Sequence, residues 1–406
     1  MNVFGNPIAN MKLRVKHIKR LDFLLIILFT LTGIYFGIFI YSLRSEEQSI
    51  EITSYIASQT RLCYQSKASG QCYRDLAVNL LDKYKLPEIL NELAKDVTQT
   101  GSVKLSACHN ITHYLGREAY KRSNNIQQTF KQCNQICLTG CFHGVVEEHL
   151  AEKNLSIEDD NALEKEIQTL CGKEEDYDNF IKFQECLHGL GHGLMFLTEN
   201  DLPRVLRLCE SLSTQDEILN CQNGAFMENA HSNSEHPSKY IKEDDPNFPC
   251  SILDKKYLNN CYIYQSHRLV SIGKNDWKKI FQLCYTFPKD YWYQCFRSLG
   301  TFQPTISSDV EVMKANCALI TDPDHRNICI GGVAEIFSHY LSSSNVDFSK
   351  TIKFCSIVDL ENKGYCYTKM GQDLKKWTRS RSEMDAICSK IPEEEYRDVC
   401  ISATKK

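Results

Sequence analysis

The sequence lacks the short motifs that mark many common functional sites. It contains no CxxC, which excludes zinc ribbons, thioredoxin-like redox sites and c-type haem attachment. It also contains no GxSxG, HExxH, GxGxxG or Walker sequence, so the enzyme and nucleotide-binding classes built on these motifs are disfavoured. Basic residues are not in excess, because 47 Lys and Arg face 51 Asp and Glu. With a net charge of −4, we expect no nucleic-acid partner.

One long stretch near the N-terminus has no charged side chain at all. Residues 23–43 are uncharged, and as a helix they would span about 30 Å, the thickness of a bilayer's hydrocarbon core. Residues 1–20 carry five Lys and Arg and no acid, and no small-x-small cleavage site follows the apolar run. We therefore expect a single-pass cell-membrane protein with an uncleaved signal-anchor over 21–43, a cytoplasmic tail over 1–20 and a juxtamembrane helix over 44–62. The remainder would be periplasmic or extracellular.

Cysteine, in contrast, is abundant and regularly spaced. The chain has 20 cysteines, an even number, and six times in the C-terminal half two of them are separated by ten or eleven residues. The second cysteine of each pair opens an amphipathic stretch, and these second cysteines recur at steps of 40, 34, 34, 37 and 34 residues. A period of this length with two helix-length segments per unit predicts an all-α fold, an α-solenoid of helical hairpins.

We expect each regular cysteine pair to form a disulfide between consecutive helices, worth on the order of 3 kcal/mol. For example, one helix is predicted to end near Cys284, and the next to start near Cys295. In the cluster upstream, Cys133 and Cys141 match the repeat, which leaves Cys108 for Cys137. Reduced cysteines in a cytosolic protein are the alternative, but the regular spacing favours an oxidising compartment. The other predicted pairs are Cys63 with Cys72, Cys171 with Cys186, Cys209 with Cys221, Cys250 with Cys261, Cys317 with Cys329, Cys355 with Cys366 and Cys388 with Cys400.

Small residues recur three positions after the second cysteine of a repeat. They are Gly144, Gly189, Gly224, Ser298 and Gly332. Glycine inside a helix costs about 1 kcal/mol relative to alanine, so its repetition predicts that helices approach closely there.

The histidines are concentrated in the first repeats. A His-rich part over 63–235 is followed by a polar, proline-containing insertion over 236–249 and by His-poor stapled repeats over 250–406. Three consecutive repeats carry an i,i+4 pair just after a cysteine, and residues four apart share one face of a helix. Since equivalent positions of stacked repeats line one wall, the six residues are predicted to converge on one or two metal ions. They are His109, His113, His143, Glu147, His188 and His192.

Imidazole and carboxylate ligands suit zinc, iron, copper or manganese, and the cysteines are spent in disulfides. Six ligands exceed one tetrahedral zinc, so a dinuclear centre is predicted. A metal-dependent hydrolytic or oxidative enzyme is compatible with such a centre, and the sequence leaves open whether the protein is an enzyme. The alternative is a scaffold for envelope proteins or peptides, in which the histidines form hydrogen-bonding ladders or a polar concave wall without metal. Nearby residues expected to orient ligands or transfer protons are Tyr114, Glu118, Glu148, His149, Glu228, His231 and His267.

Two resemblances accompany these patterns. The repeat period resembles that of tetratricopeptide solenoids, although their consensus residues are absent and disulfide staples are foreign to them. Paired His and Glu on successive helical hairpins are similar in concept to deoxyhypusine hydroxylase, a di-iron solenoid enzyme. That enzyme uses His-Glu dipeptides, whereas this chain has i,i+4 pairs, so no residue assignment follows from the resemblance.

Overall fold

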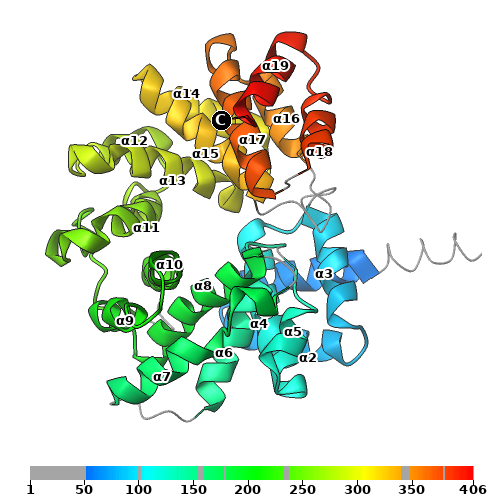
Figure 1. The fold of residues 1–406 in the computed structure, drawn as a ribbon, viewed down its shortest axis with the longest axis vertical. Coiled ribbons are helices and arrows are strands. Elements are labelled where there is room, and N and C mark those ends of the chain that lie inside the picture. Colours follow the sequence, from blue (N-terminus) through cyan, green and yellow to red (C-terminus); the bar gives the residue numbers. More distant parts are fainter. Residues whose placement is uncertain are drawn as a thin grey trace, which may run out of the picture. The chain divides into compact units, whose positions relative to one another are not determined.

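A computed structural model describes residues 52–97, 102–134, 136–153, 159–177, 180–232, 237–339, 348–377 and 380–405. All regular secondary structure in these ranges is helical, and from Ile56 onward the chain forms one compact unit (Figure 1). A first helix covers residues 52–65. The helices that follow are α2 (Ser69–Leu81), α3 (Leu86–Lys95), α4 (Leu105–Ser123), α5 (Ile126–Phe130), α6 (Gly140–Glu152), α7 (Asp160–Leu170), α8 (Phe180–Leu197), α9 (Leu202–Cys209), α10 (Gln215–His231), α11 (Leu258–Ile272), α12 (Trp277–Cys284), α13 (Trp292–Ile306), α14 (Val310–Ala318), α15 (Pro323–His339), α16 (Ser349–Ile357), α17 (Leu360–Trp377), α18 (Arg381–Cys388) and α19 (Glu394–Ala403). Short 3₁₀ turns lie at Glu174–Asp176, Cys250–Ile252, Lys255–Tyr257 and Lys289–Tyr291.

The predicted membrane localisation is contradicted. Among the residues that the structure describes, no helix combines the length and the apolar character needed to cross a bilayer. The segment predicted as the anchor, residues 21–43, lies outside the described residues, as do the tail over 1–20 and the start of the predicted juxtamembrane segment.

The ten disulfides join the cysteines in the pairs predicted from spacing. The Cα atoms of every pair lie 5.3–5.8 Å apart, and the structure contains no free cysteine. As predicted at Cys284, the first cysteine of several pairs ends a short helix, as α9, α12 and α18 illustrate. Each of these disulfides therefore fixes a short helix to the longer helix that follows it.

Most of the second cysteines lie inside their helices instead of opening them, which corrects the prediction. Helix α10 begins at Gln215, a full turn or more before Cys221, and α15 begins at Pro323, well before Cys329. The earlier starts have local causes. The Thr214 side chain caps α10 by accepting from the backbone N–H of Glu217, and proline is well suited to a first helical position because its missing N–H would have no partner there.

The same correction applies to six further second cysteines, each of which lies three or more residues after the start of its helix. They are Cys72 in α2, Cys186 in α8, Cys261 in α11, Cys295 in α13, Cys366 in α17 and Cys400 in α19. Their predicted partners are nevertheless confirmed. The bonds are Cys63–Cys72, Cys171–Cys186, Cys250–Cys261, Cys284–Cys295, Cys355–Cys366 and Cys388–Cys400. Spacing along the chain therefore predicted which cysteines pair, but placed the start of the second helix too late.

The longer helices pack against one another in chain order. Helix α4 contacts α6, α6 contacts α8, and α8 contacts α10, while α13, α15, α17 and α19 form a second such series (Figure 1). In several of these pairs, among them α4/α6, α8/α10 and α13/α15, the helices cross so closely that the backbones meet at glycine. A Cβ on Gly144 would strike the carbonyl oxygen of His113, and the same relation holds for Gly224 with His188 and for Gly332 with Arg297. The predicted close approach is confirmed at these three glycines.

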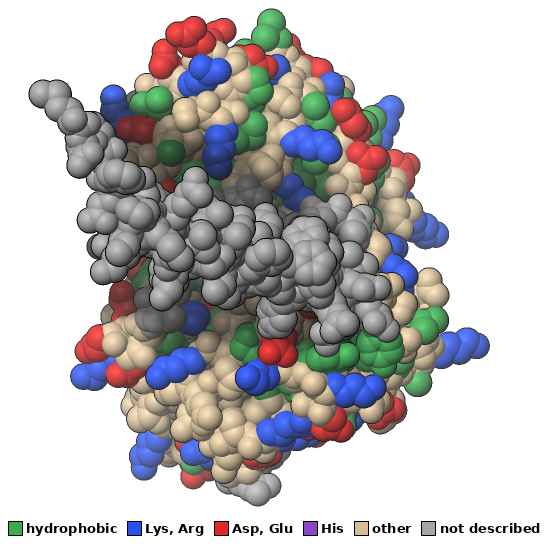
Figure 2. All heavy atoms as spheres, turned by 90° about the vertical axis from the view of Figure 1, so that its right-hand side faces the viewer, with side chains coloured by type: hydrophobic (Ala, Val, Ile, Leu, Met, Phe, Trp, Pro, Cys, Tyr) green, Lys and Arg blue, Asp and Glu red, His purple; other side chains and the backbone are tan. Residues whose placement is uncertain are grey.

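Charges of both signs are mixed on the surface seen in Figure 2. Blue and red side chains of the described residues alternate there without gathering by sign. No histidine of the described part is visible on this face.

Candidate metal centre

Four histidine rings from three consecutive long helices meet at one place. Helix α4 supplies His109 and His113, α6 supplies His143, and α8 supplies His192. The ring centroids of His109 and His113 lie 4.5 Å apart, those of His113 and His143 5.2 Å apart, and those of His143 and His192 4.6 Å apart. A fifth ring, His188 of α8, lies 5.0 Å from His143. The convergence follows from helix order, because α6 packs between α4 and α8.

The protons on the two α4 histidines are fixed by their outer partners. Nδ1 of His109 lies 2.9 Å from the carbonyl oxygen of Cys137, which only accepts, so this nitrogen donates. Nδ1 of His113 lies 3.3 Å from Oε2 of Glu147, a carboxylate oxygen that also accepts. In the neutral rings, both Nε2 atoms therefore carry a lone pair. These two Nε2 atoms face each other at 3.0 Å.

The third ring is oriented in the same way from α6. Nε2 of His143 lies 3.1 Å from Oγ1 of Thr139, whose own proton is donated to the carbonyl oxygen of Leu138. The Thr139 hydroxyl therefore accepts from His143. Nδ1 of His143 is left with a lone pair and lies 3.3 Å from Nε2 of His113.

Three lone pairs thus point into one small space with no proton to share between them. Ligand nitrogens at 2.0–2.1 Å around a tetrahedral zinc ion would lie about 3.3 Å from one another. The nitrogen–nitrogen distances of 3.0 and 3.3 Å are near this value, and one nitrogen from each of His109, His113 and His143 lies within 4.8 Å of the others. These three imidazole nitrogens could therefore hold a cation together.

A proton is a poor substitute for that cation. Burial, reinforced by the neighbouring imidazoles, holds the pKa of His109 and of His143 well below the ordinary value. The pKa of His188 is lowered for the same reasons. Near neutral pH these rings are uncharged, which is the form that binds metals.

A second group of three histidines adjoins the first and shares His143 with it. Nitrogens of His143, His188 and His192 also lie within 4.8 Å of one another. Nδ1 of His192 donates to Oε2 of Glu228 at 2.8 Å, so its Nε2 carries the lone pair. This Nε2 atom is buried and has no hydrogen-bond partner, and the residue is only 3% exposed. An unpartnered acceptor at such depth is costly unless something fills the space beside it.

Glu147 forms an ion pair with Arg117 and accepts a hydrogen bond from the outer nitrogen of His113. Nε and Nη2 of Arg117 donate to its Oε2 at 2.9 and 2.6 Å. Burial favours its protonated form, yet Arg117 and His113 together hold the pKa of Glu147 well below its ordinary value. Glu147, His192 and Glu228 also lie within ligand distance of one another. Each of the two carboxylates, however, already accepts a hydrogen bond from a histidine ring of the cluster. Carboxylates that fix ligand histidines in this way are typical of metal centres.

Several residues expected to support the site lie elsewhere. Tyr114 stacks on Tyr73 of α2, Glu118 pairs with Arg122, and Glu148 pairs with Lys121. His149 is hydrogen-bonded to Tyr120 and Glu166. These four predicted residues are turned about the helix, away from the face that carries the ligands. Glu228 is the expected supporting residue that does contact the cluster.

His231 and His267 form a separate pair one repeat further along the chain. Nδ1 of His267 lies 3.3 Å from Nε2 of His231, and its Nε2 lies 3.0 Å from Oγ of Ser298. The His267 ring also stacks on Phe302. The pair therefore has protein partners of its own.

Three contributors to the site were not predicted from the sequence. Arg117 could have been found, because it follows His113 by four residues and continues the 109–113 face. Glu185, whose Oε2 lies 3.5 Å from Nε2 of His143, precedes His188 by three, and burial raises its pKa to about 7. Thr139 gave no signal, since its contact depends on a backbone turn.

Comparison of the chain with models of known protein families gives no match, and comparison with curated proteins gives none either. Function is therefore inferred from the geometry of the cluster.

Proposed function

We propose that the protein binds a transition-metal ion through His109, His113 and His143. The observation that carries this proposal is the set of three ring nitrogens that face one another at 3.0 and 3.3 Å, each with its proton on the far side. Without a cation, this arrangement sets lone pairs against one another in a buried space. With a cation, all three lone pairs are used.

The adjoining group provides a second metal position, so that the centre holds one or two ions. Its ligands are His188 and His192, and His143 lies within ligand distance of both groups, although its single lone pair can bind an ion in only one position at a time. The buried, unpartnered Nε2 of His192 supports this assignment. Glu147 then acts chiefly as the acceptor that orients His113, and Glu228 plays the same role for His192.

The ligand set favours zinc, with copper and iron as the other candidates. All cysteines are in disulfides, so no thiolate is free to bind. Neutral imidazole suits these three metals, and three protein ligands leave a tetrahedral ion with one open position. An open position is typical of zinc ions that activate water. Hydrolysis is therefore the activity that this ligand set favours.

The scaffold that holds the site is proposed to be an α-solenoid. The glycine crossings support this, because α4/α6, α8/α10 and α13/α15 repeat the same backbone contact at equivalent residues. The disulfide-linked short helices support it as well, because a short helix precedes most of the long helices. Such a stack could also bind proteins or peptides on its inner wall, and that is the function left if no metal binds.

Metal analysis of protein purified without a His-tag tests the proposal. Wild-type protein is expected to contain one to two equivalents of metal, and His143→Ala almost none, because His143 lies within ligand distance of both groups. His325→Ala is the matched control, since this α15 histidine stacks on Phe296 outside the cluster and should leave the metal content unchanged. Chelation should remove the metal without unfolding the disulfide-linked helices. Metal-free wild-type protein that also fails to bind added Zn²⁺ would refute the proposal.

A further inference from the structure

Three consecutive residues just before α6 have left-handed backbone conformations. Cys137, Leu138 and Thr139 have φ values of 56°, 56° and 59°. Among the described residues, no other run of positive φ is longer than two. Residues with a Cβ rarely adopt this conformation in succession, and such strain persists only where the surrounding structure enforces it.

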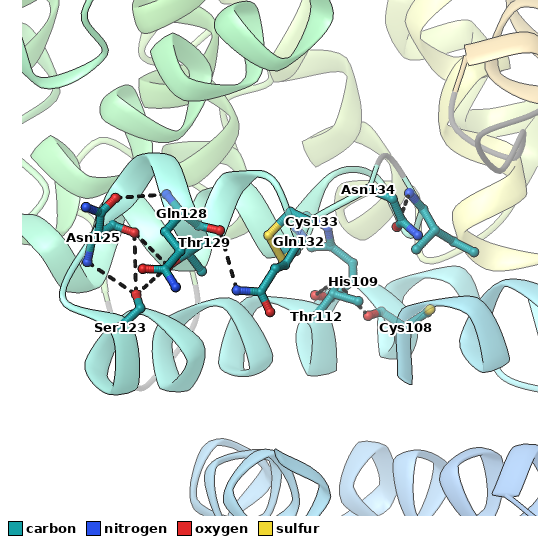
Figure 3. The surroundings of a disulfide bond; sticks show 12 residues. Cys108, His109, Thr112, Ser123, Asn125, Gln128, Thr129, Gln132, Cys133 and Asn134 are labelled. Carbon is teal, nitrogen blue, oxygen red and sulfur yellow. Dashed lines mark hydrogen bonds between the residues drawn. A yellow bond between two sulfur atoms is a disulfide. The ribbon is translucent and has the colours of Figure 1, made fainter. Parts of the chain in front are cut away.

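Two disulfides enforce this turn from both sides. Cys133–Cys141 closes a loop around it, and Cys108–Cys137 attaches the middle of that loop to α4. The second bond differs from the other nine: it spans 29 residues, whereas the others span 8–15 and connect segments next to each other in the chain. Figure 3 shows the preceding segment, from Ser123 to Asn134, running back along α4 toward Cys108 and His109.

The same turn orients two of the three proposed ligands. The carbonyl oxygen of Cys137 accepts from Nδ1 of His109 at 2.9 Å, and Oγ1 of Thr139 accepts from Nε2 of His143 at 3.1 Å. These contacts keep the lone pairs of both rings turned inward. A relaxed, right-handed turn would move both acceptors away from the rings. Because α4 already packs on α6 through Gly116 and Gly144, the disulfide is not needed to bring the helices together.

We propose that the Cys108–Cys137 disulfide is a positioning element of the metal centre, holding the left-handed turn 137–139 so that its acceptors orient His109 and His143. This inference rests on the proposed metal binding. The other nine disulfides join segments that are next to each other in the chain, one of them around this turn, and Cys108–Cys137 is assigned to the site.

Cobalt titration of disulfide variants tests the assignment. The variant Cys108→Ala/Cys137→Ala retains Cys133–Cys141, and the control Cys317→Ala/Cys329→Ala removes an equally buried disulfide between α14 and α15. We expect Co²⁺ to bind the first variant about 10–100-fold more weakly, with altered d–d absorption, because outer contacts to ligand histidines have effects of this size. The control should match the wild type in both readouts, although both variants should have a lower Tm.

Thr139→Val provides a second route that leaves every disulfide intact. It removes the acceptor for His143 and should weaken Co²⁺ binding about tenfold even if the double-alanine variant fails to fold. Wild-type affinity and spectrum in either folded variant would overturn the inference, and so would equal weakening in the control. A wild-type protein that binds no Co²⁺ would instead refute the proposed metal binding itself.

Discussion

Helix pairs α4/α6 and α13/α15 share one backbone crossing and differ in what they do with it. In each pair, a glycine on the second helix contacts the carbonyl oxygen of a residue on the first, at Gly144 with His113 and at Gly332 with Arg297. Three residues after each glycine stands a glutamate, which reaches that same first-helix residue. In one pair Glu147 meets His113, and in the other Glu335 meets Arg297.

The residue opposite the glutamate decides the chemistry of the crossing. Arg297 donates to Glu335 through two nitrogens, at 2.8 and 2.5 Å, and has no lone pair to offer a metal. His113 donates through one nitrogen and keeps a lone pair on the other. Both crossings therefore contain an ion pair, which Arg297 makes with Glu335 in one and Arg117 makes with Glu147 in the other. The α4/α6 crossing differs in that His113 also contacts the glutamate and keeps a lone pair as a candidate metal ligand.

The crossing itself should carry the largest effect on stability. Gly144→Ala and Gly332→Ala each force a methyl group against a backbone carbonyl, and each is expected to lower the free energy of unfolding by about 3 kcal/mol. Only Gly144→Ala should also reduce zinc content, because it displaces His113. Urea denaturation with the disulfides intact and metal analysis measure the two effects.

Gly364→Ala is the control for this pair of variants. No heavy atom lies within 4 Å of the Cβ it would add, so the change should stabilise α17 by about 1 kcal/mol. If Gly144→Ala kept both its stability and its zinc, the crossing would not be what sets the position of His113.

Placing an arginine at position 113, as at position 297 of the second pair, should abolish metal binding. In His113→Arg the guanidinium offers no lone pair, and it would have to share Glu147 with Arg117, which already donates to that carboxylate through two nitrogens. Zinc affinity is expected to fall at least about 100-fold, or about 2.7 kcal/mol. The free energy of unfolding is expected to fall by about 1–3 kcal/mol, because the added buried cation has no carboxylate of its own. Competition titration against a chromophoric chelator and calorimetry measure these quantities.

His113→Gln separates the lost lone pair from the added charge. It removes the ligand nitrogen and stays neutral, so it should lose zinc to a similar extent. Tight zinc binding by His113→Arg would mean that His113 is not a ligand.

Much of this comparison could be predicted from the sequence, because it depends on residues that are close together in the chain. Cysteines ten or eleven residues apart pair correctly when each bond joins neighbouring helices, and i,i+4 spacing places His109 and His113 on one face whatever the tertiary structure. Stacking in chain order then brings His143 to the same face.

What the sequence did not predict depends on backbone strain and on distant packing. The left-handed turn at 137–139 contradicts the local preferences of its residues, so Thr139 could not be recognised as a partner of His143. His231 and His267 were selected from the sequence by the same spacing as the candidate ligands, but in the structure His267 contacts His231 and Ser298. Helix packing decides which histidines are hydrogen-bonded to neighbouring side chains and which turn a lone pair toward other histidines.

The ion pair of the second crossing should give the smallest effect and leave the metal untouched. Arg297→Met leaves the carboxylate of Glu335 half-buried without its bidentate partner, and is expected to lower the free energy of unfolding by about 1–2 kcal/mol. Adding Glu335→Gln removes the charge and should recover part of that loss, so a double-mutant cycle should give a coupling of about 1 kcal/mol. Zinc content should equal that of the wild type in all three variants. A fall in zinc would connect the two crossings through the stack, whereas an absence of coupling would make Arg297 a solvated side chain. In either case the later repeats would no longer be the metal-free counterpart of the earlier ones.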